Sequence, residues 1–237
     1  ECSANGALAC LDAGFDADAV LIPEPFGPTI LTSQVGILWF RVDVAGKPSH
    51  VLGTKAGSNA IEKLFPIIQA LRGLEQEMND EAPHEAYQGI PHPLNLNVGI
   101  VKGGDWPSTV PAFAEIHCRL ACYPGVRQED IRRRVVDCVK QAASRDPWLA
   151  ANRPTVQFYG FRSSGHFLGM DNPVLSTLGD CHRELTGTDP KEYIATCTTD
   201  LSVFTSYGRG SATCYGPVAK NIHAANECVN LDSIIHT

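Results

Sequence analysis

Three side chains that could bind a divalent metal ion lie far apart along the chain, at Glu1, Glu24 and His223. Two carboxylates and an imidazole suit zinc, which binds deprotonated oxygen and nitrogen donors. A zinc ion held in this way would lower the pKa of a bound water molecule for hydrolysis. The spacing alone leaves an alternative open, because loop glutamates are mostly solvated and loop histidines are often surface or capping residues.

The sequence around Glu24 predicts where this carboxylate lies. Residues 19–22 form a short apolar run, which predicts a strand covered on both faces, as in a parallel sheet. Open α/β sheets bind their ligands just beyond the carboxyl ends of the strands, and Glu24 follows this run directly. Pro23 and Pro25 fix φ on either side, so we expect a stiff loop that holds the carboxylate in place.

The composition is that of an ordinary globular protein, long enough at 237 residues for one large domain or two smaller ones. A net charge of −7 argues against a nucleic-acid surface, and no apolar run approaches the roughly 18 residues of a membrane span. Nine cysteines without a CxxC pair indicate free thiols of a cytoplasmic protein. The start at Glu1, without Met, predicts a processed or excised terminus.

The middle of the chain alternates between strand and helix patterns in the order β-α-β-β-α-β, which is the ferredoxin-like arrangement. The strands are expected at 34–45, 94–101, 110–122 and 155–161, and the helices at 59–71 and 125–145. Asn59 and Glu62 resemble a capping box at the start of the first helix. Its predicted apolar stripe includes Phe65, and Pro66 should either kink the helix or mark a later start.

The two flanks have the pattern of one α/β domain that the middle segment interrupts. We expect elements at 3–11, 19–22, 172–186, 192–197, 211–215, a short helix capped by Asp200 and a helix from about Ala225. The predicted division is therefore 1–33 and 163–237 for the α/β domain and 34–162 for the insertion. The flanks hold too few strands for a complete sheet, which predicts a further piece before Glu1.

Short catalytic motifs of other enzyme classes are not found. His84-Glu85 has no second histidine at the zincin spacing, and Gly-Xaa-Ser-Xaa-Gly does not occur. Gly208-Arg209-Gly210 lacks the third glycine of a dinucleotide-binding fingerprint. A metal-dependent hydrolase with dispersed ligands remains compatible with the sequence.

An ordered set of short motifs carries a resemblance to a known family. These are ECSANGA at 1–7, DAVLIPEP at 18–25, GKPSH at 46–50, GSNAI at 57–61, GG at 103–104, VP at 110–111, TD at 199–200 and HAANE at 223–227. In this order they resemble the acetylornithine deacetylase, succinyl-diaminopimelate desuccinylase and carboxypeptidase G family of co-catalytic zinc amidohydrolases. The resemblance implies an incomplete α/β/α zinc-hydrolase domain interrupted by a ferredoxin-like lid and dimerisation domain.

The resemblance also implies the metal site. Glu1 and His223 would hold one zinc and Glu24 would help to hold a second, with cobalt or manganese as alternatives, while Glu227 would support the His223 loop. The general base of such enzymes precedes the ligand matched to Glu1, and a shift of the alignment by one residue would make Glu1 the base. Because the upstream ligands are absent, we expect this chain alone to bind metal poorly and to be inactive.

Three further residues receive roles from the resemblance. His50 matches a lid histidine that crosses a dimer interface to polarise the scissile carbonyl. Arg119 is a candidate clamp for a substrate carboxylate, although the family arginine aligns with Ala121. Ser108 stands where an asparagine is common, next to the substrate. The alternatives are a surface turn histidine at 50 and an ordinary strand arginine at 119.

The resulting prediction is a hydrolase that cleaves the amide bond of an N-acyl amino acid or short peptide. A homodimer through the lid is expected, with neither a nucleic acid nor a membrane as partner. Two alternatives stay open: a non-catalytic dimerisation or ligand-binding module, and a dipeptidase or aminopeptidase of the same architecture.

Overall fold

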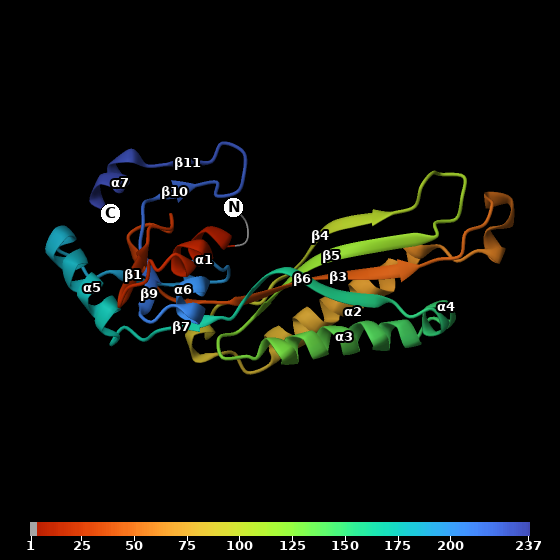
Figure 1. Cartoon of the computed structure of the whole chain (residues 1–237), viewed down its shortest axis with the longest axis horizontal. Helices are drawn as coiled ribbons and strands as arrows, with labels where there is room; N and C mark the ends of the chain where they lie inside the picture. Colours follow the sequence, from red (N-terminus) through yellow and green to blue (C-terminus); the bar gives the residue numbers. More distant parts are fainter. Residues whose placement is uncertain (1–3) are drawn as a thin grey trace.

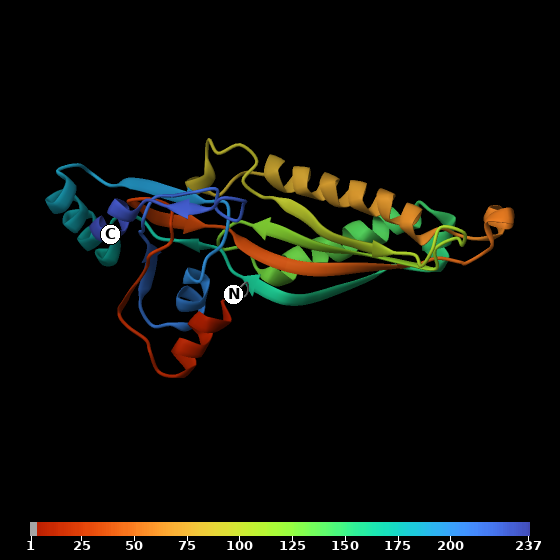
Figure 2. The ribbon, with the colours of Figure 1, turned by 90° about the horizontal axis from the view of Figure 1, so that it is seen from above.

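The computed structural model describes residues 4–237, which form an elongated molecule with two lobes (Figures 1 and 2). One lobe, here called the insert lobe, comprises residues 36–163. The other, the flanking lobe, combines residues 4–34 with residues 166–237. Glu1 lies outside the described residues.

The insert lobe is a four-stranded antiparallel sheet in the order β4-β5-β3-β6. Its strands are β3 (Gly36–Ala45), β4 (Leu96–Gly103), β5 (Phe113–Cys122) and β6 (Thr155–Ser163). Its helices are α2 (Ala60–Asp80), α3 (Gln128–Ser144) and the short α4 (Pro147–Ala151), with 3-10 turns η1 (Val51–Ala56) and η2 (Glu85–Tyr87). The order of strands and helices is the ferredoxin-like arrangement that the sequence predicts.

Only one face of this sheet is covered, because α2 and α3 both pack on the same side (Figure 1). Leu38, Phe40 and Val42 of β3 are buried on that side, whereas Trp39 and Arg41 alternate with them and are half-buried. This alternation agrees with the two faces expected from the sequence. We call the uncovered side the open face of the insert lobe.

Helix α2 begins where the sequence predicts. The side chain of Asn59 accepts hydrogen bonds from the backbone N–H groups of Ile61 and Glu62, which caps the first turn. The helix continues through Pro66, so of the two alternatives for this proline the later start is wrong. Pro66 and Glu62 are both exposed, and the carbonyl that loses its partner can be hydrated. The predicted inward position of Phe65 is also wrong: its side chain is 59% exposed.

The flanking lobe contains short sheets with helices around them. Its strands are β1 (Ala19–Ile22), β2 (Thr29–Gln34), β7 (His166–Phe167), β8 (Lys191–Ala195), β9 (Ser211–Cys214), β10 (Ala219–Lys220) and β11 (Cys228–Val229). Its helices are α1 (Asn5–Asp12), α5 (Pro173–Thr186), α6 (Leu201–Tyr207) and α7 (Leu231–His236). β1 pairs with β9 in parallel, β2 lies between β7 and β8, and β10 pairs with β11.

Two expectations for this lobe are wrong. β1 is not covered on both faces, since Ala19 is exposed and Leu21 is 48% exposed. The last helix begins at Leu231 rather than near Ala225. Positive φ angles at Asn221, His223 and Asn226 turn the chain repeatedly before it, and a helix cannot form through such a segment.

The chain passes between the lobes twice, at residues 34–36 and 163–165. These two connections touch, because a Cβ atom added at Gly36 would lie 2.6 Å from the backbone nitrogen of Gly165. Only a residue without a side chain permits so close an approach of two backbones. The insertion therefore leaves and re-enters the flanking lobe at one place.

Candidate functional site

Glu24 lies just beyond the carboxyl end of β1, as the sequence predicts. The backbone N–H of Tyr215, which directly follows β9, donates to the carbonyl of Ile22 at 3.2 Å. A Cβ atom added at Gly216 would lie 2.1 Å from the carbonyl oxygen of Glu24. The segment after β9 and the Glu24 loop are therefore in close contact, and the carboxylate of Glu24 is half-buried there.

Two titratable side chains, Asp200 and His223, influence the pKa of Glu24. Burial raises the pKa of Glu24, the negative charge of Asp200 raises it further, and His223 lowers it. Asp200 is the residue before α6, but its side chain makes no cap hydrogen bond to that helix, in contrast to the expected capping role. Asp200 and His223 therefore both lie near enough to Glu24 to influence its charge, at one end of the flanking lobe.

His223 lies on the exposed turn between β10 and β11, in a left-handed backbone conformation with φ 61. Its backbone N–H donates to the Glu227 carboxylate at 3.2 Å, which agrees with the supporting role expected of Glu227. Within residues 4–237 no group of three or more His, Cys, Asp or Glu side chains is arranged to hold a metal ion. The donors near Glu24 are chemically suited to zinc, but the described residues do not form a complete ligand set.

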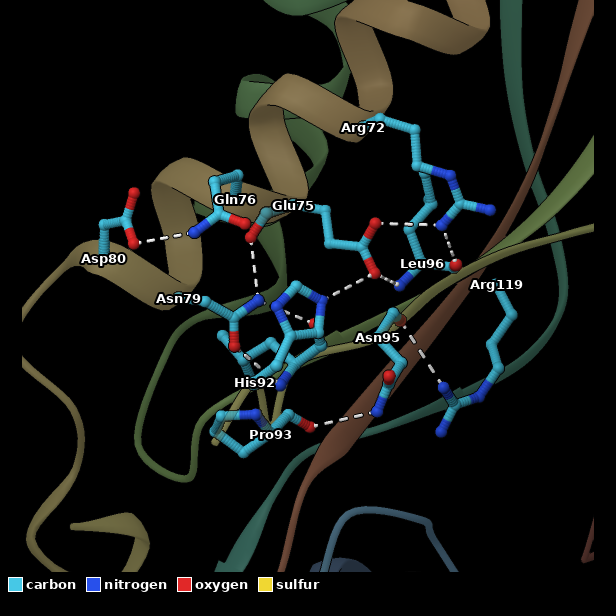
Figure 3. A network of polar contacts seen from close by, with 11 residues as sticks. Arg72, Glu75, Gln76, Asn79, Asp80, His92, Pro93, Asn95, Leu96 and Arg119 are labelled. Atoms are coloured by element: carbon cyan, nitrogen blue, oxygen red, sulfur yellow. Dashed lines mark hydrogen bonds and ion pairs between the residues drawn. The ribbon is translucent and has the colours of Figure 1, made fainter. Parts of the chain in front are cut away.

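Arg119 of β5 lies between the two lobes. Its guanidinium donates to the carbonyl of Asn95 at 3.4 Å and to that of Thr196 at 3.5 Å (Figure 3 shows the first of these contacts). Burial lowers the pKa of Arg119, and the nearby Cys197 thiol opposes this shift. No ion pair with Arg119 is found among residues 4–237. A half-buried cation without a carboxylate partner is suited to bind an anionic group.

The start of β4, next to Arg119, is fixed by a polar network that the sequence motifs do not reveal (Figure 3). Buried Glu75 accepts hydrogen bonds from the backbone N–H of Leu96 at 2.7 Å and from Arg72 at 2.9 Å, and it contacts His92 at 3.1 Å. Asn79 bonds the backbone of Leu94 in the same way. The signal in the sequence is a glutamate at a position of α2 that should be apolar.

His50 and Ser108 lie elsewhere, at the far end of the insert lobe. The Nδ1 atom of His50 accepts from the backbone N–H of Leu52 at 3.2 Å, and the His50 backbone pairs with Thr109, next to Ser108. In Figure 1 the loop that carries His50 is at the opposite end of the molecule from β1. The predicted site residues within the described chain thus form two separate groups, with His50 and Ser108 in one and Glu24, His223 and Arg119 nearer the other end.

Comparison with known proteins places the insertion in a described domain family. Residues 32–147 match the peptidase dimerisation domain of the M20 type. Over 250 aligned residues the chain is 22% identical to the N-formyl-4-amino-5-aminomethyl-2-methylpyrimidine deformylase of Halalkalibacterium halodurans, a match that covers 97% of this chain and 57% of that protein. It is 27% identical over 136 residues to the acetylornithine deacetylase of Vibrio cholerae, covering 57% of this chain and 35% of that protein.

Solved structures share the fold over nearly the whole chain. Aminopeptidase PepT from Bacillus cereus superposes with a TM-score of 0.72 at 15% identity, covering 99% of this chain and 58% of PepT. The M20 family metallo-carboxypeptidase Sso-CP2 from Sulfolobus solfataricus gives 0.69 at 15% identity, with 98% and 63% coverage. The chain thus spans less than two thirds of the length of these relatives. With its ferredoxin-like insert and these matches, the chain resembles the M20 family of metal-dependent hydrolases, and residues 32–147 match the dimerisation domain of that family.

Proposed function

We propose that this protein is a metal-dependent hydrolase that cleaves the amide bond of an N-acyl amino acid. The observation that carries the proposal is that Glu24, half-buried beyond the carboxyl end of β1, has both Asp200 and His223 near enough to influence its charge, in a chain that resembles the M20 family. Two curated relatives are named a deformylase and a deacetylase, which supports removal of an acyl group from an amine.

Glu24 and His223, together with Glu1, are proposed to hold zinc, with two ions per subunit and cobalt or manganese as alternatives. Bound metal would supply an activated water molecule and polarise the scissile carbonyl. Glu24 must be deprotonated to bind a cation, and both its burial and Asp200 oppose this in the metal-free chain. A nearby cation would remove that penalty, so metal binding and loss of the Glu24 proton are coupled.

Arg119 is proposed to orient the substrate by binding its carboxylate. Among residues 4–237 the guanidinium makes two long contacts to backbone carbonyls, so a carboxylate could replace or join them with charge-assisted hydrogen bonds. Such a clamp would fix the acyl amide relative to Glu24.

We also propose the domain division that the sequence predicts, with boundaries after residues 33 and 162.

A homodimer through the insert lobe completes the proposal. β4 is an edge strand of the sheet, and it exposes Ile100 and Val101 at 45% and 56%. Phe65 of α2 is exposed as well, and α2 packs against the part of the sheet that includes β4. A two-fold pairing would let His50 and Ser108 of one protomer approach the Glu24 end of its partner, which they do not reach within one chain.

Metal content and hydrolysis in the full-length protein test the proposal. Glu24→Gln and His223→Gln should each lower the zinc retained after dialysis, measured by mass spectrometry, and abolish release of acetate from N-acetyl amino acids. Glu184→Gln, an exposed carboxylate on α5, is the matched control and should change neither quantity. Full metal retention in both variants would refute the ligand assignment.

The same assay separates the alternatives. Hydrolysis of dipeptides but not of N-acetyl amino acids would identify a peptidase, in agreement with the solved structures that share the fold. Absence of bound metal from the full-length protein would favour the non-catalytic binding module.

A cytoplasmic location is also proposed. Every cysteine within residues 4–237 is a free thiol, which supports this location. No helix among the described residues could cross a membrane.

A further inference from the structure

The open face of the insert lobe carries an aromatic group directly beside Arg119. Trp39 of β3 is the cross-strand partner of Arg119 of β5 in the antiparallel ladder. Partners of this kind project from the same face of a sheet, with Cβ atoms about 4.5–5.5 Å apart. The cation and the indole therefore begin from adjacent positions on the side that α2 and α3 leave uncovered (Figure 1).

The indole of Trp39 belongs to a cluster of three aromatic rings. Its centroid is 6.4 Å from that of Tyr159 and 6.1 Å from that of Phe161. The register of β3 and β6 shifts here, so that residues 159–161 of β6 lie opposite the single residue Trp39 of β3. Gly160 has φ +62, and a Cβ atom at this position would lie 2.9 Å from Cε3 of Trp39. The irregularity and the glycine together make room for the indole against β6.

The rings are held by partners on both sides. The hydroxyl of Tyr159 is 2.5 Å from Nδ1 of His117, whose Nε2 is 3.1 Å from the Glu115 carboxylate. Phe161 packs against the apolar cluster that joins α1 and α6 in the flanking lobe. Trp39 itself stays half-buried. An apolar surface of this kind, fixed by its neighbours and still accessible, is suited to bind a ligand ring.

From these contacts we propose that Trp39 determines substrate specificity, and that the protein prefers N-acyl amino acids with an aromatic or bulky apolar side chain. The substrate carboxylate binds Arg119, and its apolar group packs on the indole of Trp39 beside Tyr159. This inference rests on the proposed hydrolase function for the identity of the ligand. It goes beyond that function by naming the part of the substrate that is selected and the side chain that selects it.

The chain offers a direct probe, because it contains only three tryptophans. In the full-length protein with Trp106, Trp148 and any tryptophan outside residues 1–237 replaced by Phe, fluorescence reports on Trp39 alone. N-acetyl-phenylalanine should change this emission in metal-free protein and bind at least about fivefold more tightly than N-acetyl-alanine, as expected for ring packing on an indole. Equal affinities, binding of neither compound, or tighter binding of N-acetyl-lysine would overturn the proposal.

Substitution then identifies the selecting residue by calorimetric titration. Trp39→Leu should reduce the preference for N-acetyl-phenylalanine to about twofold or less, and Trp39→Phe should keep most of it. Phe113→Leu is the matched control, since Phe113 lies on the same strand as Arg119 at the far end and is 46% exposed. It should retain the preference, and a loss equal to that of Trp39→Leu would overturn the assignment. If Trp39→Leu does not fold, Trp39→Phe and the single-tryptophan protein still test whether Trp39 selects the substrate.

Binding without turnover distinguishes this inference from the proposed function. A preference that depends on Trp39, combined with no hydrolysis of the bound compound by metal-loaded protein, would refute the hydrolase and leave the binding surface in place. Hydrolysis of N-acetyl-alanine and N-acetyl-phenylalanine with equal kcat/KM would support the hydrolase and overturn the role of Trp39.

Discussion

Glu75 and Glu24 show two ways in which a carboxylate is buried in this protein. Glu75 is surrounded by hydrogen-bond donors, whereas Glu24 has another carboxylate, Asp200, among its charged neighbours. Burial raises the pKa of Glu75, but the donors from Leu96, Arg72 and His92 outweigh it, so the net pKa lies below the ordinary value. The opposite shifts agree with a structural role for Glu75 and with a proposed ligand role for Glu24.

Replacing Glu75 by Gln should destabilise the fold by about 1.5–3 kcal/mol, because charge-assisted bonds to the start of β4 are lost. A carboxylate whose pKa is depressed in the folded state stabilises that state above its unfolded pKa of about 4.3. The stabilisation is lost as the pH falls through the lower folded value. The difference between wild type and variant should therefore be full at pH 7 and shrink below about pH 4.

Urea unfolding of the two proteins at several pH values measures this difference. Glu77→Gln, an exposed position on the same helix, is the control and should change the free energy of unfolding by less than about 0.5 kcal/mol. An E75Q variant as stable as wild type at pH 7 would show that the network contributes nothing to folding.

Individual site residues were predictable only as far as local pattern reaches. The position of Glu24 followed from a short apolar run ended by prolines, and β1 forms over the predicted residues. The separation of His50 from Glu24 did not follow, because it depends on the length and direction of the insert lobe. The pairing of Trp39 with Arg119 did not follow either, because it depends on the register of β3 and β5.

At the level of elements, α2 and α3 begin in different ways. Asn59 accepts two backbone hydrogen bonds at the start of α2, while Arg127, in the equivalent position before α3, makes no side-chain cap bond. The first turn of α2 therefore depends on its cap, and that of α3 does not. This pair gives a matched test of capping within one lobe.

Asn59→Ala should lower the free energy of unfolding by about 1 kcal/mol, as typical for loss of an N-cap. Arg127→Ala should cost less than about 0.5 kcal/mol, since only exposed ion pairing with Asp130 is lost. Denaturant unfolding monitored by far-ultraviolet circular dichroism checks both. Equal costs for the two variants would contradict the capping interpretation.

The elements of the insert lobe were predictable because they alternate strongly in hydrophobicity. β2 was not predicted, because it lacks such an alternation. Its last three residues, Thr32, Ser33 and Gln34, are polar yet buried, and each makes side-chain hydrogen bonds. The start of α7 was misplaced because positive φ angles in the His223 turn are not encoded in residue periodicity. Tertiary contacts override the local pattern at both places.

For the whole molecule, the proposed dimer makes the edge of β4 the critical surface. Val101→Lys places a charge on this edge strand and should shift the protein from dimer to monomer. Leu185→Lys is the control, because Leu185 of α5 is 78% exposed but lies in the flanking lobe. Sedimentation equilibrium over a range of protein concentrations measures the change. An unaltered dimer in V101K would exclude β4 as the contact, and a wild-type monomer would exclude the dimer itself.

The touching connections at Gly36 and Gly165 have a consequence for how such a protein could be rebuilt. Ile37 and Ser163, next to these two points, are register partners, so the first and last strands of the insertion close on each other. Cutting the chain at these two points would release a domain whose two ends lie together. The ends could then be joined by a short linker, or the domain could be inserted into another protein. Exchange of this piece between related chains would carry the proposed dimer contact with it while leaving the recipient scaffold intact.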